Sequence, residues 1–377
     1  MAISEMYLET LSLTNFKNYE LQTLELSPQL NCFVGENGMG KTNLLDAIHV
    51  LCLSKSHFMS SDQNLVRTGE DFFRLQGKFN RQGKGEDIVV KYKLRGKKQI
   101  ERNKIPYKRI SEHVGLLPLV IIAPDDIQLI MQGSEERRRF LDLCLVQLDP
   151  EYMQQLMLYN QVLEQRNALL RAADDHHSPD PSLLDIYDAQ LLKPAEFIFN
   201  KRTELIEKLT TIFQTCYAAI SGERETVEMR YTSQLQGADF EMLLLESRRK
   251  DIILQRSNKG IHKDDLELEI KGQALKRFAS QGQLKSFLMA MKLAQYEFLR
   301  QFLNIPPLLL LDDIFDRLDA TRVSQLLDLL LKRDFGQIFI TDTHEERVAT
   351  ILKTLSLKSN YKKFMIKDAQ VISEQSA

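Results

Sequence analysis

The stretch "GENGMGKT", residues 35–42, decides the fold class of this chain. It satisfies the pattern G-x-x-x-x-G-K-[ST], in which glycines let backbone N–H groups turn inward around phosphate oxygens. The apolar stretch "QLNCFV" before it is typical of a strand, and "NLLDAIHVLCL" after it has the apolar spacing of a helix. Lys41 is expected to bridge the β- and γ-phosphates, and the Thr42 hydroxyl to ligate Mg²⁺. The stretch therefore predicts a nucleotide site at the positive end of a helix.

A second stretch, "LLLLDDIFDRLD" at 308–319, is an apolar run that ends in two carboxylates. A buried parallel strand would deliver Asp312 at its carboxyl end, where α/β sheets bind ligands. An aspartate at that place suits a Mg²⁺ ligand, directly or through water. Asp313 would be placed to polarise an attacking water. The alternative is a core strand with a charged exit loop, which the phosphate loop makes the weaker interpretation.

A third stretch, "FASQGQLKSFLMAMKLAQ" at 278–295, has two interpretations. Ser280 and Gln283 have the spacing of a capping box, which would simply start an amphipathic helix. Gly282 is unfavourable inside a helix by roughly 1 kcal/mol, and a glycine at a capped helix start also suits an anion site. The spacing alone leaves both interpretations open.

The composition is that of an ordinary globular chain, large enough for one big domain or two moderate ones. Its 377 residues are 43% hydrophobic and 27% charged, with a net charge of −2, so any nucleic-acid surface must be local. The four cysteines show no metal spacing, which predicts reduced packing cysteines in a cytoplasmic protein. We expect no membrane segment, because the longest aliphatic run, "IPPLLLLDD", is too short to span a bilayer.

The pattern of elements changes along the chain. Alternating apolar residues predict strands at the start and an antiparallel meander over about 72–109, and "LPLVIIAPDD" (117–126) predicts a buried strand. From about 133 to 244 the pattern is almost entirely helical, with a polar break at 174–182. Strand patterns resume at 265–272. The simplest interpretation is an α/β head with two antiparallel helices inserted into it.

The order of these motifs resembles that of an ABC-type ATPase head: phosphate loop, long insertion, Ser-x-Gly-Gln turn, and apolar strand ending in Asp-Asp. Further stretches together resemble the RecF family of bacterial recombination-mediator ATPases, related to the SMC-like ATPases, over nearly the whole chain. They are "NFKNY", "GENGMGKTNLLDAI", "LSKSHF", "LVIIAPDDIQLIMQGSEERRRFLD", "QVLEQRNALL", "HKDDLELEIKG", "FASQGQLKSFLMAMKLAQ" and "LLLLDDIFDRLD". The implied fold is an α/β P-loop ATPase head of mixed sheet, flanking helices and antiparallel strands over 1–132 and 245–377, with a helical arm over 133–244.

The resemblance implies that the phosphate loop binds ATP, and that Thr42 and Asp312 hold Mg²⁺. Lys41, Asp312 and Asp313 would form the catalytic set. Asp313 stands where many ABC enzymes have a glutamate, and the shorter side chain implies slow hydrolysis. Lys17 stands where the family usually has an arginine near the nucleotide, and a lysine lacks the bidentate fork. The implied ATP-binding residues are Lys17, Gly35, Glu36, Asn37, Gly38, Met39, Gly40, Lys41, Thr42 and Asn43.

In the same family, the signature turn of one subunit closes over the γ-phosphate held by its partner. The signature residues acting in trans would be Ser280, Gln281, Gly282 and Gln283. Asp316 and Asp319 fall in the loop that meets the partner subunit.

Three further places depart from the family pattern. "GIHKDD" replaces the usual Gly-Pro-His-Arg-Asp-Asp, which leaves the roles of that loop open. No glutamine clearly matches the Q-loop after "LVIIAP", and Asp126 and Gln128 are the two candidates there. The switch position falls on His344, Thr341 or Asp342, depending on the register.

The segment "KYKLRGKKQIERNKIPYKR" (91–109) is densely basic. In a strand, Lys91, Lys93 and Arg95 would alternate onto one face. A solvated sheet face would explain this pattern, but the RecF resemblance favours DNA binding by Lys91, Lys93, Arg95, Lys97 and Lys98. Such binding would be directed at the backbone and sensitive to salt. "EERRR" (135–139) is a weaker candidate, because its arginines would also pair with the preceding acids or lie near the nucleotide.

The implied function is an ATP-dependent homodimer that clamps duplex DNA near single-strand gaps and single-strand/double-strand junctions. Weak, DNA-stimulated ATP hydrolysis would release it. RecR and RecO are the implied partners, and loading of RecA in gap repair and replication restart the implied outcome. The alternatives are the ATPase subunit of a transporter and another SMC-like chromosome-maintenance ATPase. The basic segment and the long insertion argue against the transporter, and an insertion of this length allows only a short coiled-coil arm.

Overall fold

The computed structural model describes residues 6–172, 179–222, 225–317, 330, 335–354 and 361–376, without the side chains of 316, 317, 349, 351–354 and 376. The chain divides into two compact units. The first comprises Met1–Asp126, Thr215–Arg224 and Gln281–Ala377, and the second comprises Ile127–Gln214 and Glu225–Ser280.

The first unit contains an antiparallel sheet in the order β2-β1-β4-β5-β6-β7. Its strands form because apolar and polar residues alternate, so that one face is buried, as in the burial pattern of β1. This sheet confirms the predicted meander. The strands are β1 (Met6–Phe16), β2 (Tyr19–Glu25), β4 (Phe72–Arg81), β5 (Lys84–Lys93), β6 (Gln99–Arg102) and β7 (Ile105–Pro106).

A second sheet of the first unit has the order β15-β14-β3-β13-β12-β8. All neighbours from β14 to β8 are parallel, and β15 is antiparallel to β14. The strands β3, β8 and β12 are buried along their whole length, as continuous apolar runs in parallel sheets are. The strands are β3 (Leu30–Val34), β8 (Leu119–Ile122), β12 (Leu308–Leu311), β13 (Ile338–Asp342), β14 (Tyr361–Lys367) and β15 (Gln370–Ser376).

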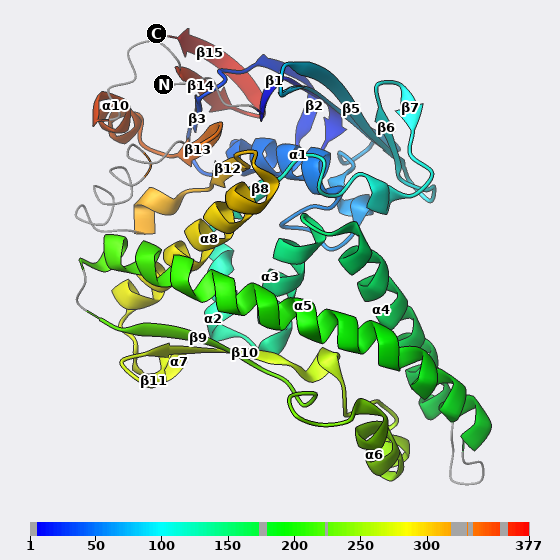
Figure 1. Cartoon of the computed structure of the whole chain (residues 1–377). Coiled ribbons are helices and arrows are strands. Elements are labelled where there is room, and N and C mark those ends of the chain that lie inside the picture. Colours follow the sequence, from blue (N-terminus) through cyan, green and yellow to red (C-terminus); the bar gives the residue numbers. More distant parts are fainter. Residues whose placement is uncertain are drawn as a thin grey trace. The chain divides into compact units, whose positions relative to one another are not determined.

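Two buried helices pack on these sheets. The helix α1 (Lys41–Leu53) contacts strands of both sheets (Figure 1), and α8 (Gln281–Leu303) contacts β8. The side chain of Gln337 accepts from Leu8 N at 2.7 Å and donates to Leu8 O and Ser27 O, which ties β1 to the start of β13. The remaining short elements are η1 (Asp62–Leu65), η2 (Ile110–Glu112), η3 (Pro124–Ile127), η5 (Ile314–Arg317) and α10 (Glu345–Thr354).

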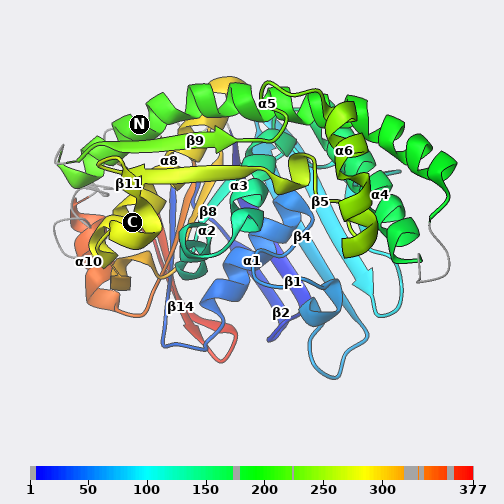
Figure 2. The same ribbon diagram turned by 90° about the horizontal axis from the view of Figure 1, so that it is seen from below.

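The second unit combines helices with a small antiparallel sheet in the order β11-β10-β9. Figure 2 shows β9 and β10 running along α5, where Gln214 Nε2 donates to Val227 O at 3.1 Å. The elements are α2 (Gln128–Met131), α3 (Ser134–Val146), α4 (Pro150–Arg171), α5 (Pro181–Ser221, whose last turns belong to the first unit), β9 (Val227–Thr232), α6 (Phe240–Leu254), η4 (Ile261–Lys263), β10 (Asp265–Ile270), β11 (Gln273–Ala274) and α7 (Leu275–Phe278).

The prediction that residues 133–244 are almost entirely helical is wrong at β9. Val227 and Met229 are buried and alternate with the exposed Glu228 and Arg230, which is a strand pattern that a helical interpretation hides. The pairing of β9 with β10 also explains why the second unit extends to Ser280, beyond the predicted arm boundary at 244. The predicted head and arm therefore differ in their bounds from the two compact units.

Two fully buried arginines hold the second unit together. Arg166 on α4 donates to Asp188 on α5 at 2.6 Å and to Asp251 on α6 at 2.8 Å. Arg202 on α5 donates to Asp142 on α3 at 2.8 Å and to Asp264 at 3.1 Å. Buried charges of this kind are tolerated because each is paired and hydrogen-bonded.

Candidate functional site

The phosphate loop lies between β3 and α1. Gly38 and Gly40 have φ of 80° and 108°, which are left-handed values that favour glycine. At Gly40 a side chain would also collide, because a Cβ there would lie 2.9 Å from Asn18 Nδ2 and 3.0 Å from Tyr19 Oη. At Gly38 the space is open. The loop therefore has the curvature of a phosphate cradle, closed on the side of Asn18 and Tyr19.

Lys41 folds over this loop. Its Nζ donates to Gly35 O at 2.8 Å and to Glu36 O at 3.0 Å, and the residue is only 4% exposed. These carbonyl contacts hold the ammonium group at the mouth of the loop, within reach of anything bound by the loop's N–H groups.

The next residue, Thr42, contacts the end of another strand. Its Oγ1 donates to Asp312 Oδ1 at 3.0 Å and lies 3.2 Å from Oδ2. Asp312 directly follows β12, and Thr341 on the neighbouring β13 also donates to its Oδ1, at 2.8 Å. Burial raises the pKa of the Asp312 carboxyl, and the two hydroxyl donors oppose that rise only in part.

Asp313 has an unusual backbone and an unsatisfied side chain. Its φ is 43°, in the left-handed region that non-glycine residues rarely adopt, and its N–H donates to Thr341 Oγ1 at 2.9 Å. Its Oδ1 is buried and has no hydrogen-bond partner among the described residues. Strain together with an unpaired buried acceptor is typical of a functional position.

The turn after β1 supplies further contacts to the loop. Asn43 Nδ2 donates to Asn18 Oδ1 at 2.7 Å, and Tyr19 Oη donates to Gly40 O at 3.2 Å. Lys17, the residue predicted near the nucleotide, instead directs its Nζ to the buried carboxylate of Asp46 on α1, at 2.7 Å. Asn18 and Tyr19 were not predicted as site residues, although they lie in the quoted motif "NFKNY" beside Lys17.

The predicted signature turn is accessible. The helix α8 begins at Gln281, directly after Ser280, and both residues are exposed, while Gly282 and Gln283 are half-buried. The predicted apolar face of the helix is confirmed, since Leu284, Phe287, Leu288 and Met291 are all buried. Phe278, just before the turn, has 59% of its surface exposed.

The structure places the two Q-loop candidates in different units. It also distinguishes the switch candidates by their contacts and exposure. Asp126 is held in the interior of the first unit, where Oδ1 accepts from Lys292 Nζ at 2.8 Å and Oδ2 accepts from Ala123 N at 2.7 Å. Gln128 opens α2 of the second unit. Of the three switch candidates, Thr341 contacts Asp312, whereas the His344 side chain is 64% exposed.

The predicted dimer loop is described only at its start. Asp316 lies in η5, without a described side chain, and Asp319 lies outside the described residues.

The five predicted DNA-binding cations divide into two groups. Lys91 pairs with Glu101 at 2.7 Å, and Lys98 pairs with Asp62 at 2.8 Å, so both have structural partners. Lys93, Arg95 and Lys97 are exposed, and none of them forms an ion pair within the described part of the chain. The predicted alternation is wrong for Arg95, because β5 ends at Lys93 and Arg95 lies in a turn with φ of 62°.

The arginines of "EERRR" and the loop "GIHKDD" belong to one arrangement inside the second unit. Arg137 binds both carboxylate oxygens of Asp265, at 2.6 and 3.0 Å, and Arg138 donates to Asp264 O at 2.7 Å. Arg139 is exposed and lies 3.9 Å from Glu136. Arg137 thus pairs with an aspartate of the later loop rather than with the preceding acids that the sequence suggested.

Two predictions from composition are addressed by the structure. All four cysteines are free and buried, which confirms the prediction of packing thiols. Across the described residues, no helix is both long enough and apolar enough to cross a membrane.

Comparison with known proteins identifies the family to which this chain belongs. The sequence model of the RecF/RecN/SMC N-terminal domain matches residues 7–365. The DNA replication and repair protein RecF of Parabacteroides distasonis is 44% identical over 366 residues, which cover 97% of this chain and 99% of that protein. RecF of Flavobacterium johnsoniae is also 44% identical, over 95% of this chain and 99% of its own.

Solved structures give the same result. A structure of the recombination mediator protein RecF with ATP, from the RecFOR pathway, has a TM-score of 0.87 at 29% identity, with 100% of this chain and 99% of that chain covered. The Smc head domain of Pyrococcus furiosus has a TM-score of 0.56 at 17% identity over 99% of this chain and 96% of its own, which shows a shared fold alone. The predicted fold class, a P-loop ATPase head with mixed and antiparallel strands and a helical insertion, is confirmed. The chain belongs to the RecF family of DNA replication and repair proteins.

Proposed function

We propose that this chain is an ATP-dependent DNA-binding recombination mediator. Two copies close around ATP, the closed dimer holds duplex DNA near single-strand gaps, and slow hydrolysis releases it. One observation carries the proposal: Thr42 and Asp312, 270 residues apart in the sequence, meet directly beside the loop that Lys41 spans. A related RecF structure contains ATP.

The nucleotide half of the site is built by one chain. The N–H groups of residues 35–43 surround the phosphates, and Lys41 moves from the carbonyls of Gly35 and Glu36 to the β- and γ-phosphate oxygens. Asn18 and Tyr19 fix the shape of the loop through Asn43 and Gly40. Lys17, whose Nζ pairs with Asp46 on α1, is proposed to lie near the bound nucleotide.

The residues at the end of β12 fit a magnesium ion. The donor set consists of a hydroxyl and a buried carboxylate 3.0 Å apart, which are hard oxygen ligands of the kind that Mg²⁺ takes in phosphoryl-transfer sites. When bound, the ion neutralises charge on the phosphate oxygens. Thr42 and Asp312 would hold it, and Thr341 orients the Asp312 carboxylate.

Hydrolysis needs a group that accepts a proton from the attacking water. Asp313 is the proposed base, because its buried Oδ1 has no other partner in the described residues. The water oxygen forms a bond to the γ-phosphorus, the bond to the β–γ bridging oxygen breaks, and the proton passes to Asp313. The strained backbone of Asp313 and the shortness of an aspartate are consistent with slow turnover.

The proposed second half of the site comes from the partner subunit. The signature residues Ser280 to Gln283, of which Ser280 and Gln281 are exposed, lie at the start of α8, whose N-terminal N–H groups suit a γ-phosphate. Asp316 and Asp319 are proposed to lie in the loop that meets this partner. ATP favours the dimer only because it makes contacts across the interface that a monomer lacks.

The DNA surface is proposed to include the exposed cations Lys93, at the end of β5, and Arg95 and Lys97, in the segment that joins β5 to β6. Lys91 and Lys98 are also proposed to belong to this DNA surface. Each of them already forms an ion pair, Lys91 with Glu101 and Lys98 with Asp62. RecR, RecO and RecA are the proposed partners, in keeping with the RecFOR pathway in which the related structure stands. We also propose that the protein is cytoplasmic.

Sedimentation tests the sandwich mechanism. With ATP under non-hydrolysing conditions, the native chain is expected to dimerise at micromolar concentration. Ser280→Arg should stay monomeric and inactive while still binding ATP, because the serine acts on the partner's nucleotide. Ser60→Arg, at an exposed serine of the first unit, is the control and should dimerise. A native chain that stays monomeric, or a Ser280→Arg chain that no longer binds ATP, would contradict the mechanism.

A further inference from the structure

The helix α6 of the second unit carries apolar residues on its exposed side as well as on its buried side. Figure 2 shows α6 beside α4. Its buried residues are Phe240, Leu244, Ser247 and Asp251. Its exposed apolar residues are Met242, Leu245, Ile253 and Leu254. The outer side of a surface helix is usually polar, and exposed apolar side chains that gather on one element mark interaction sites.

Exposed cations flank Ile253, which itself has 71% of its surface exposed. Residues 249–263 contain five Lys and Arg residues and a single acid, Asp251. That acid is fully buried and accepts from Arg166 at 2.8 Å, so it does not offset the surface charge. The exposed cations form no ion pair within the described part of the chain. The α6 patch is defined here as Arg249, Lys250, Ile253, Leu254, Arg256 and Lys263.

Two cations of the α6 patch lie close enough to repel each other. Partial burial, together with the charges of Arg256 and Arg138, lowers the pKa of Lys263. The charge of Asp251 opposes this shift only in part. A carboxylate bound between Arg256 and Lys263 would relieve the repulsion and form charge-assisted hydrogen bonds.

The turn that follows α6 is held rigidly. Gln255 ends the helix with a φ of 51°, and Ser257 N donates to Asn167 Oδ1 on α4 at 2.7 Å. Asn258 N and Nδ2 each donate to Asp251 Oδ1 at 3.0 Å. The backbone of the α6 patch is therefore fixed before any ligand arrives, and binding costs little of its conformational entropy.

We propose that the α6 patch docks an acidic segment of a partner protein that carries apolar residues among its carboxylates. The carboxylates pair with the exposed arginines and lysines, and an apolar side chain packs on Ile253 and Leu254. Arginine suits this role because its planar guanidinium binds a carboxylate through two parallel hydrogen bonds. The α6 patch contains none of the proposed nucleotide-binding or DNA-binding residues, so the inference goes beyond the proposed function.

Three other occupants match the α6 patch less well. A second copy in a two-fold dimer would bring the same four cations against one another. Duplex DNA would pair with the cations but hides its base faces, which would leave Ile253 without an apolar contact. A helix that lies on a membrane needs a continuous apolar stripe, whereas Arg249 stands between Leu245 and Ile253 on the outer side of α6.

The test uses a short fluorescein-labelled peptide in which phenylalanine and leucine alternate with aspartate and glutamate. One control peptide has serine at the apolar positions, and another has lysine at the acidic positions. Fluorescence anisotropy measures binding to the native chain, Ile253→Ser and Arg256→Glu. Duplex DNA and vesicles that contain an anionic phospholipid are measured with the same proteins.

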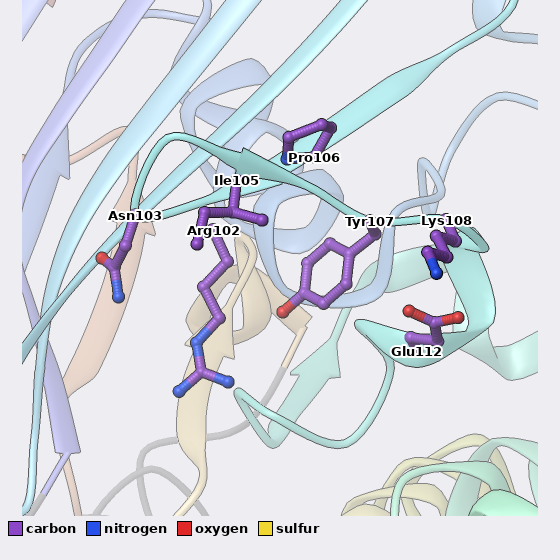
Figure 3. Close-up of a pocket in the computed structure, with 7 residues that line it drawn as sticks. All are labelled: Arg102, Asn103, Ile105, Pro106, Tyr107, Lys108 and Glu112. Atoms are coloured by element: carbon purple, nitrogen blue, oxygen red, sulfur yellow. The ribbon is translucent and has the colours of Figure 1, made fainter.

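Ile105→Ser is the matched control variant. Ile105 is also 71% exposed and also lies among cations, on the β6–β7 hairpin of the first unit. There it lines a pocket with Arg102 and Tyr107 (Figure 3). The three substituted side chains are all at the surface, so the variants are expected to unfold at the same temperature as the native chain.

The native chain should bind the acidic apolar peptide roughly tenfold more tightly than the serine peptide, the effect of burying one aliphatic side chain, and should not bind the lysine peptide. Ile253→Ser should lose this tenfold difference, and Arg256→Glu should weaken the binding of both acidic peptides. Ile105→Ser should behave as the native chain.

Three results would overturn the inference. In the first, the native chain binds neither acidic peptide or does not distinguish them. In the second, Ile105→Ser loses the difference and Ile253→Ser keeps it. In the third, Ile253→Ser loses affinity for duplex DNA or for the vesicles while its binding of the peptide is unchanged.

Discussion

Thr42 Oγ1 and Asp312 Oδ1 lie 3.0 Å apart, and this hydrogen bond joins the start of α1 to the end of β12. The contact brings together two motifs that the sequence separates by 270 residues. It also leaves a buried carboxylate held mainly by hydroxyl donors, which is an arrangement that stability alone would not select. A divalent ion would explain why the aspartate is there.

Replacing Asp312 with asparagine should separate function from stability. Asp312→Asn is expected to abolish Mg²⁺-dependent ATP hydrolysis, because a neutral amide is a poor ligand for the ion. Without nucleotide and metal it should be more stable than the native chain by about 1 kcal/mol, since burial disfavours the carboxylate, as the raised pKa indicates. Urea unfolding in the presence of a chelator measures this. A less stable Asp312→Asn chain would mean that the carboxylate is structural.

Removing the loop lysine should affect both the free and the bound protein. Lys41→Ala is expected to abolish the rise in Tm on adding ATP. It should also destabilise the free chain by about 1–3 kcal/mol, because the carbonyls of Gly35 and Glu36 lose their buried donor. Thermal unfolding with and without ATP gives both numbers. Lys97→Ala, at an exposed lysine, should change neither the stability nor the ATP-dependent shift, and an undiminished shift in Lys41→Ala would contradict the proposed site.

Two substitutions at Asp313 distinguish its chemistry from its strain. Asp313→Asn should lower kcat roughly 100-fold or more with ATP affinity unchanged, because an amide cannot accept the proton. Asp313→Gly should be equally inactive yet more stable by about 1 kcal/mol, since glycine adopts a φ of 43° without strain. Single-turnover hydrolysis and urea unfolding measure the two effects. Native turnover in Asp313→Asn would assign the base elsewhere.

Much of this site was predictable because its motifs are local. The phosphate loop needs a strand, glycines and a helix within a few residues, and the fully apolar run before Asp312 has few interpretations other than a buried strand. The predicted phosphate loop and Asp312 do lie together. The same locality made the antiparallel meander and the apolar face of α8 predictable.

Other contacts depend on side-chain geometry that periodicity does not carry. The ammonium group of Lys17 pairs with Asp46 on α1. Nothing in the residue spacing of the sequence predicts this ion pair. Thr341 contacts Asp312 only because β13 lies beside β12 in the sheet order. Lys91 and Lys98 form ion pairs with Glu101 and Asp62. Strand register and the tertiary fold determine these partners, and the local sequence pattern does not show them.

The buried arginine of the second unit should be indispensable. Arg166→Met is expected to destabilise the chain by about 3–5 kcal/mol, because it leaves the carboxylates of Asp188 and Asp251 buried without their main cation. Adding Asp188→Asn and Asp251→Asn should recover part of that loss. Arg139→Ala, at an exposed arginine, is the control and should cost less than about 0.5 kcal/mol. Urea unfolding measures the stability of Arg166→Met, of the triple variant and of Arg139→Ala. A small effect of Arg166→Met would mean that the second unit repacks around Asp188 and Asp251.

Acid should destabilise the second unit through His262. Its Nδ1 lies 2.7 Å from Tyr159 Oη and its Nε2 lies 3.1 Å from Ser257 O, so the neutral ring accepts from the tyrosine and donates to the carbonyl. Burial lowers the pKa of His262 to about 4. The folded state therefore binds this proton more weakly than the unfolded chain, and stability is lost as the pH falls from the ordinary histidine range towards 4.

His262→Asn should flatten this part of the pH profile. The asparagine cannot gain a charge, so urea unfolding between pH 7 and 4 should show a smaller loss than in the native chain, by up to about 3 kcal/mol at the acid end. Some acid dependence should remain, because burial also lowers the pKa of His49, in the first unit, to about 4. If the His262→Asn profile matched the native one, the interior around Tyr159 would have to admit water or an anion when the histidine is protonated.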